Sequence, residues 1–147
     1  MQRRGWTIAL ALCMLAGASR DGAGQGTKKA GAPPARTTLT AGGAYTSEQA
    51  SRGRYVYTGT CRNCHMPESH TGAVFAKWWR GKQLSELFAY VSQNMPKNDP
   101  GTLNPEDVAD VVAYLLKMNA MPAGKTELPP DLGELKKIRI EMRKAAR

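Results

Sequence analysis

Two cysteines and a histidine lie within five consecutive residues of this 147-residue chain. The run Cys61-Arg62-Asn63-Cys64-His65 has the C-x-x-C-H pattern, which is typical of covalent haem attachment. Each thiol can add to one vinyl group of a haem, because the two intervening residues let one short turn reach both groups. The histidine then presents its imidazole to the iron as the proximal ligand. The motif predicts one covalently bound haem c, held by Cys61, Cys64 and His65.

The same cysteine spacing also occurs in thioredoxin-like redox motifs and in half of a zinc site. A zinc ion would need Cys61 and Cys64 together with two ligands from His65, His70 or a carboxylate. Adjacent ligands at Cys64 and His65 are awkward for one tetrahedral ion, and a second cysteine pair is missing from the sequence. A disulfide between the two cysteines would leave the histidine without a role. The histidine next to the second cysteine therefore favours the haem interpretation.

The first 18 residues have the pattern of a secretory signal peptide. Two arginines precede an apolar stretch at residues 8–15, which is too short to span a bilayer, and small residues at 16–18 provide a cleavage site. Cys13 would leave with this peptide, and acylation of Cys13 is disfavoured because Leu12, a large residue, precedes it. We therefore expect export to the periplasm, and no later segment has the length and apolarity of a membrane span.

Composition divides the rest of the chain into three parts. Residues 19–44 are rich in Gly, Ala, Pro, Thr and Lys, so we expect a flexible linker there. Residues 45–130 form the one expected domain, and residues 131–147 form a basic C-terminal segment. The whole chain has a formal charge of +9, but residues 45–130 carry nine Lys and Arg against eight Asp and Glu. The basic charge therefore belongs to the flanking segments and gives no support for nucleic-acid binding.

Apolar residues at helical spacing predict three helices in the domain. The helices are expected at about residues 46–59, 84–93 and 104–119. Thr46 is expected to cap the first helix, with Gln49 as its capping-box partner, and Asn104 is expected to cap the third. Strands are not expected, because no segment alternates with a two-residue period. The predicted fold class is therefore all-α.

The second axial position of the iron is assigned to Met95. It follows the second expected helix, and Pro96 favours an extended loop that can present the thioether. Met121 also precedes a proline and is the competing candidate, but it follows the last expected helix. Met66 adjoins His65 and cannot reach the opposite face of the haem. We therefore predict iron ligation by His65 and Met95.

Residues 45–130 resemble the monohaem class I cytochromes c. The resemblance is carried by Gly53 and Tyr57, the run Cys61–His65, Met95-Pro96 and the run Val111–Leu115. It implies the class I cytochrome c fold, in which three core helices surround a covalently attached haem. It also implies that the first and last helices cross closely, with Gly53 and Tyr114 at the crossing.

A narrower resemblance concerns the partners. Parts of the domain are similar to the small cytochromes that accept electrons from periplasmic quinoprotein dehydrogenases; these parts are residues 75–90, Met95-Pro96 and residues 122–128. The resemblance implies a quinoprotein dehydrogenase as electron donor and an oxidase or another cytochrome as acceptor. With both axial positions filled, the protein would be an electron carrier and not an enzyme. If Met95 does not bind, the iron is five-coordinate, and small-ligand sensing or peroxidase chemistry is the alternative.

The aromatic residues and the C-terminal segment lead to three further expectations. Phe75, Trp78 and Trp79 are expected in the wall of the haem pocket or in the core, with indole donation to a haem propionate as the sharper alternative. His70 is expected in a loop. The apolar residues at 131–147 are expected to pack on the domain, with a further helix for a membrane surface or a partner as the alternative.

Overall fold

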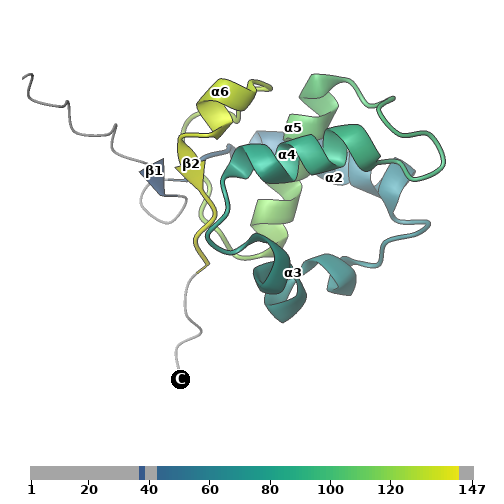
Figure 1. The fold of residues 1–147 in the computed structure, drawn as a ribbon, viewed down its shortest axis with the longest axis horizontal. Helices are drawn as coiled ribbons and strands as arrows, with labels where there is room; N and C mark the ends of the chain where they lie inside the picture. The colour runs from purple at the N-terminus through teal and green to yellow at the C-terminus, as the bar shows by residue number, and fades with distance from the viewer. Residues whose placement is uncertain (1–36, 39–42, 143–147) are drawn as a thin grey trace, which may run out of the picture. The chain divides into compact units, whose positions relative to one another are not determined.

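The structure, a computed structural model, describes residues 37–38 and 43–142 of the chain. Its elements are, in chain order, β1 (Thr37–Thr38), α2 (Ser47–Val56), a π-helical turn (Tyr57–Cys61), a 3-10 turn (Pro67–His70), α3 (Gly72–Trp79), α4 (Leu84–Asn94), α5 (Pro105–Met118), α6 (Leu132–Leu135) and β2 (Ile138–Arg139) (Figure 1). The signal peptide expected at residues 1–18 and most of the linker expected at residues 19–44 lie outside the described residues.

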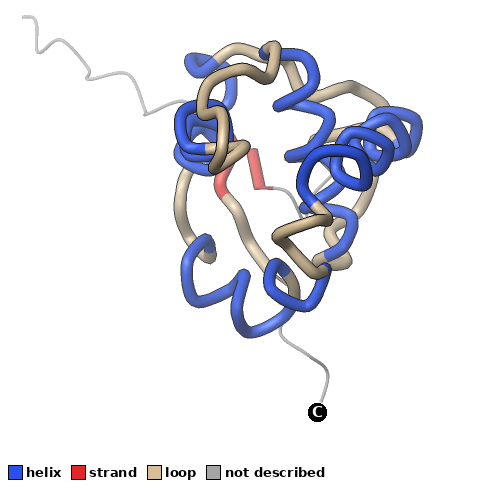
Figure 2. Tube along the Cα trace, turned by 90° about the vertical axis from the view of Figure 1, so that its right-hand side faces the viewer, coloured by secondary structure: helices blue, strands red, loops and turns tan. Residues whose placement is uncertain are grey.

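Helices form nearly all of the regular structure in the described part of the chain, which confirms the all-α prediction (Figure 2). None of the helices at residues 43–142 is long and apolar enough to cross a membrane. The exception to the helical pattern is the parallel pair β1 and β2, in which Thr37 aligns with Ile138 and Thr38 with Arg139. The expectation of no strands is therefore wrong for these residues. Strands of two residues are too short to show a two-residue alternation in the sequence.

The start of α2 is tied to the segment that follows α5. The Thr46 hydroxyl accepts a hydrogen bond from the Gln49 N–H at 3.1 Å, which confirms Thr46 as the N-cap. The Gln49 side chain does not return this bond, so the capping-box prediction is wrong. It is buried, and it donates to the Leu128 carbonyl at 3.0 Å and accepts from the Leu128 N–H at 2.8 Å. A buried amide is most stable when both of its ends are bonded, and a distant backbone supplies both partners here.

The backbones of α2 and α5 come into close contact at Gly53. A Cβ built on Gly53 would lie 1.8 Å from the carbonyl oxygen of Asp110 and 3.0 Å from the backbone nitrogen of Val111. The close crossing that the resemblance implied is therefore present, but the α5 backbone occupies the place expected for Tyr114. The Tyr114 ring lies one turn farther along α5 and packs against Tyr57, with the ring centroids 5.4 Å apart.

Helices α4 and α5 begin and end close to the predicted residues. The Asn104 side chain accepts a hydrogen bond from the Asp107 N–H at 2.7 Å, which confirms it as the N-cap of α5. Helix α4 extends to Asn94, and a capping box formed by Gln83 and Glu86 stabilises its start. The apolar faces of both helices contribute to one buried core, whose aliphatic members on these helices are Leu84, Leu87, Val91, Val108, Val111, Val112, Leu115 and Leu116.

Helix α3 was not among the three predicted helices. Its N-terminus has no side-chain cap, so the sequence carries no local start signal. The Gly72 N–H at this end donates instead to the Asn119 side chain at 3.0 Å, across 47 positions of sequence. At the N-terminus of α3 a long-range hydrogen bond therefore provides the partner for a backbone N–H, whereas a local capping side chain provides it at α2 and α5.

The C-terminal segment packs on the domain through its apolar residues. Helix α6 lies against α4, and the side chains of Leu135 and Ile140 are completely buried (Figure 1). The Gly81 N–H donates to the Ile140 carbonyl at 2.8 Å, and the Ile140 N–H donates to the Lys82 carbonyl at 2.9 Å. Residues 131–142 are therefore part of the folded unit, while residues 143–147 lie outside the described residues.

This packing predicts unequal effects for the two leucines of α6. Leu135→Ala should lower the free energy of unfolding by about 2–3 kcal/mol, because a buried leucine is replaced by a cavity. Leu132→Ala is the matched control, since Leu132 is 43% exposed and its loss should cost less than about 1 kcal/mol. Denaturant titration of both variants measures the difference. Equal costs would show that the segment does not pack as described.

Candidate functional site

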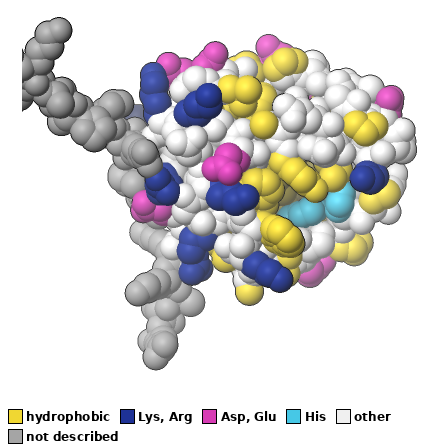
Figure 3. Space-filling view, in the orientation of Figure 1, with side chains coloured by type: hydrophobic (Ala, Val, Ile, Leu, Met, Phe, Trp, Pro, Cys, Tyr) yellow, Lys and Arg dark blue, Asp and Glu magenta, His cyan; other side chains and the backbone are white. Residues whose placement is uncertain are grey.

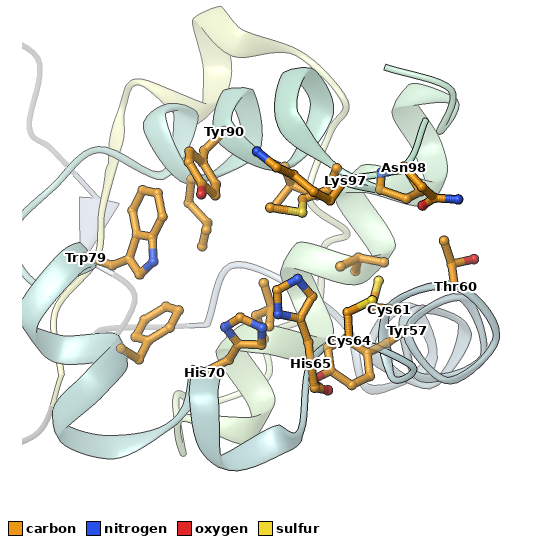
Figure 4. Close-up of a pocket in the computed structure, with 17 residues that line it drawn as sticks. Tyr57, Thr60, Cys61, Cys64, His65, His70, Trp79, Tyr90, Lys97 and Asn98 are labelled. Atoms are coloured by element: carbon orange, nitrogen blue, oxygen red, sulfur yellow. The ribbon is translucent and has the colours of Figure 1, made fainter. Parts of the chain in front are cut away.

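A pocket with about 810 Å³ of empty space, part of it open to solvent, lies between the Cys61–His65 turn and helices α3, α4 and α5 (Figure 4). Residues from every one of these elements line the pocket: Tyr57, Thr60, Cys61, Cys64, His65, His70, Phe75, Trp79, Leu87, Tyr90, Val91, Met95, Pro96, Lys97, Asn98, Val111 and Leu115. In Figure 3 the histidine side chains are visible at the surface, next to a band of hydrophobic side chains. The pocket therefore reaches the surface on this face.

The two cysteines and the histidine are arranged by one helical turn. The N–H groups of Cys64 and His65 both donate to the carbonyl of Cys61, at 3.1 and 2.9 Å. The turn brings all three side chains to the same wall of the pocket (Figure 4). Both thiols are free, with that of Cys64 on an exposed residue and that of Cys61 half-buried, and burial raises the pKa of the Cys61 thiol.

Tyr57 stabilises the Cys61–His65 turn through a hydrogen bond to its backbone. Its hydroxyl donates a hydrogen bond to the His65 carbonyl at 2.7 Å, and its side chain is almost completely buried. Burial raises the pKa of this phenol, so the hydroxyl keeps its proton at neutral pH. Tyr57 was quoted in the resemblance but was not predicted as a site residue. Its spacing of four residues before Cys61, one helical turn, is the signal that places it under the motif.

Met95 lines the same pocket from the end of α4. Its backbone is extended, and its N–H donates to the Val91 carbonyl at 3.1 Å as the C-cap of the helix. The competing methionine, Met121, is buried away from this wall, where its carbonyl accepts a hydrogen bond from the Tyr45 hydroxyl at 2.7 Å. Met66 is 57% exposed. Among these methionines only Met95 lines the pocket.

The aromatic residues of α3 separate into two groups. Phe75 is buried in the pocket wall, and Trp79 lines the pocket with its ring centroid 5.6 Å from that of Tyr90. Trp78 is 60% exposed, and the Lys77 ammonium lies 5.6 Å from its ring centroid. The expectation that Trp78 belongs to the pocket wall or the core is therefore wrong. Phe75 and Trp79 are one helical turn apart and share the inner face of α3, whereas Trp78 lies on the outer face.

His70 lies in the 3-10 turn and on the pocket wall, beside His65. The centroids of the two rings are 4.7 Å apart at an interplanar angle of 54°. Burial, and the neighbouring His65, lower the pKa of His70. His70 was expected in a loop, and in the structure it lies in a short helical turn. The sequence carried no signal that the two histidines would touch.

The residues of the pocket fit a covalently held haem. Two free thiols and an imidazole share one wall, a thioether lies in the wall formed by the end of α4, and apolar side chains supply most of the rest. The zinc interpretation has less support, because no group of three or more His, Cys, Asp and Glu side chains within the described residues could hold a metal ion.

Residues 48–115 match the family model described as cytochrome C oxidase, cbb3-type, subunit III. No curated protein and no solved structure gives a significant match to the chain. The matched segment contains all but the first residue of α2, the Cys61–His65 turn (the attachment turn), Met95 and most of α5. Together with the helical fold, the match supports a class I cytochrome c domain in this part of the chain. Electron transfer by covalently bound haem c is the general role of this class.

Proposed function

We propose that the protein is an exported electron carrier whose haem iron is ligated by His65 and Met95. The observation that supports this proposal is that His65, in the attachment turn, and Met95, at the end of α4, line the same pocket. Two axial ligands from the chain itself would leave no iron position open to a substrate. The function is therefore the passage of single electrons and not catalysis on a bound substrate.

Each part of the pocket has a defined task in this proposal. Cys61 and Cys64 would form the two thioether bonds, and His65 and Met95 would bind the iron. A bound haem c would supply a single-electron couple between Fe(III) and Fe(II). The apolar wall would keep water away from the iron, and Met/His ligation would raise its reduction potential. Tyr57 holds the His65 backbone, so that the imidazole keeps its place whichever charge the iron carries.

The location and the partners belong to the same proposal. The signal-like first 18 residues support the periplasm as the compartment, and the resemblance to dehydrogenase-associated cytochromes supports a quinoprotein dehydrogenase as donor. An oxidase or another cytochrome is the proposed acceptor. Transient redox partners use small interfaces, below about 1,200 Å² in total, and the pocket face in Figure 3 is the surface proposed for them.

Replacing Met95 tests the ligation. The oxidised protein should show the weak absorption band near the red end of the spectrum that reports Fe–thioether bonding, and Met95→Ala should abolish it. The reason is that no other thioether lines the pocket among the described residues. Met121→Ala is the control and should keep the band, because Met121 is buried away from the pocket wall.

The opposite pattern, with the band lost in Met121→Ala and retained in Met95→Ala, would move the ligand to residue 121. An unmutated protein with a five-coordinate spectrum would replace the electron-carrier proposal with the sensing or peroxidase alternative. The spectra of three samples in both redox states therefore separate all these cases.

A further inference from the structure

The two histidines of the chain lie side by side on one wall of the pocket. Their ring centroids are 4.7 Å apart, and both residues are half-buried. In Figure 4 one ring nitrogen of His65 points into the pocket, while the other is on the side of the ring that faces His70. A histidine uses only one ring nitrogen to bind a metal ion. If the nitrogen that points into the pocket binds iron, the second nitrogen of His65, on the side of His70, stays free for a hydrogen bond.

Asn119 contacts the backbone of His70, and Tyr57 contacts its ring. The Asn119 side chain, which follows α5, donates to the His70 carbonyl at 2.8 Å. The same side chain accepts from the Gly72 N–H at 3.0 Å and donates to the Leu115 carbonyl at 2.9 Å, so it fixes the backbone on both sides of Thr71. Tyr57 meets the His70 ring edge-on, with the centroids 6.3 Å apart. The backbone of His70 is therefore fixed by a hydrogen bond, and its ring packs against Tyr57.

A metal-binding histidine nearly always donates its second ring N–H to a fixed acceptor. This outer partner sets the ring orientation, selects the tautomer and raises the basicity of the ligand. A neutral imidazole can serve as such a partner, since one of its two nitrogens accepts hydrogen bonds. His70 is a side chain of this kind, and it lies against His65.

We infer that His70 is a positioning residue for the proximal ligand, and that it accepts the hydrogen bond from the second ring nitrogen of His65 when the first binds iron. The inference rests on the proposed function, because it requires His65 to be an iron ligand. A more basic His65 stabilises the oxidised iron more than the reduced iron. His70 therefore holds the reduction potential below the value that Met/His ligation in this pocket would give without it.

The direct test is a nuclear magnetic resonance measurement on the reduced, haem-loaded protein with ¹⁵N-labelled histidine. The chain contains two histidines, so a sample purified without a histidine tag has only four labelled ring nitrogens. A hydrogen bond between the rings gives a scalar coupling that links the His65 ring proton to a His70 nitrogen as well as to its own. The inference predicts this coupling in the unmutated protein and in Glu68→Gln, an exposed neighbour in the same turn.

The midpoint potential provides the second readout. His70→Leu removes the acceptor at similar volume and should shift the ratio of reduced to oxidised protein at a fixed potential about tenfold toward the reduced form, which is 59 mV for a one-electron couple. His70→Gln keeps an acceptor oxygen and should stay within about a third of that shift. A merely structural role would move the potential equally in both variants.

The outcomes separate this inference from the proposed function. A reduced protein with His65 and Met95 both bound, but with no coupling between the histidine rings, overturns the inference and leaves the proposed function intact. Loss of the low-spin spectrum in His70→Leu, with no loss in Met95→Ala, would make His70 itself a ligand and overturn both. If His70→Leu does not fold, the coupling in the unmutated protein still decides the inference.

Discussion

Replacing either cysteine of the attachment turn with alanine is expected to leave at most one thioether bond, and replacing both is expected to give a chain without covalent haem. The reason is that Cys61 and Cys64 are the two thiols that the turn brings to the pocket wall. Mass spectrometry of the denatured proteins measures the result, because only a covalent bond keeps the mass of the haem on the chain.

Of the two single variants, Cys61→Ala should be less stable than Cys64→Ala. Cys61 is half-buried and packs against the core, so Cys61→Ala also removes packing contacts, whereas Cys64 is on the exposed side of the turn. Asn63→Ala is the matched control, since the exposed Asn63 lies between the cysteines and supplies no thiol. Complete covalent loading of the double cysteine variant would contradict the assignment of these residues.

Gly53→Val should be the most destabilising substitution in the helical core. A Cβ at this position would lie 1.8 Å from the Asp110 carbonyl oxygen, and a backbone atom of a helix cannot move aside as a flexible side chain can. Helices α2 and α5 would have to separate, which should cost about 4 kcal/mol or more. For a domain of this size the melting temperature should fall by about 16 °C or more.

Gly59→Ala provides the comparison for this substitution. A Cβ on Gly59 would meet no atom within 4 Å, so the variant should melt within about 3 °C of the unmutated protein. Thermal unfolding of the haem-loaded proteins, followed in the same buffer, checks both values. A Gly53→Val variant that melts as high as Gly59→Ala would show that the two backbones do not meet at Gly53.

The predicted parts of the fold were those with local signals. Thr46 and Asn104 are capping residues at the start of amphipathic segments, and both cap helices in the structure. The start of α3 depends instead on the bond from Gly72 to Asn119, which no local pattern can reveal. The position of the Gln49 side chain could not be predicted for the same reason. Its hydrogen-bond partner, Leu128, lies 79 residues away, and a side chain bonded to Leu128 is not available for a capping box.

In the candidate site, too, local sequence patterns predicted some residues, and long-range contacts placed another. The spacing of Cys61, Cys64 and His65 is a property of one turn, so the sequence alone predicts that they lie together. The position of Met95 in the pocket was predicted from its place after a helix and before a proline. The contact of His70 with His65 was not predicted, because it depends on how the 3-10 turn is anchored by Asn119 after α5.

Acid–acetone extraction of the purified, unmutated protein tests directly whether haem is covalently attached through Cys61 and Cys64. Acid would break the proposed bonds from iron to His65 and Met95 but leaves thioether bonds intact. With covalent attachment, the haem colour should stay with the precipitated protein, and the acetone layer should be colourless. Haem recovered in the acetone layer would contradict covalent attachment and, with it, the identification of the Cys61–His65 turn as the haem site.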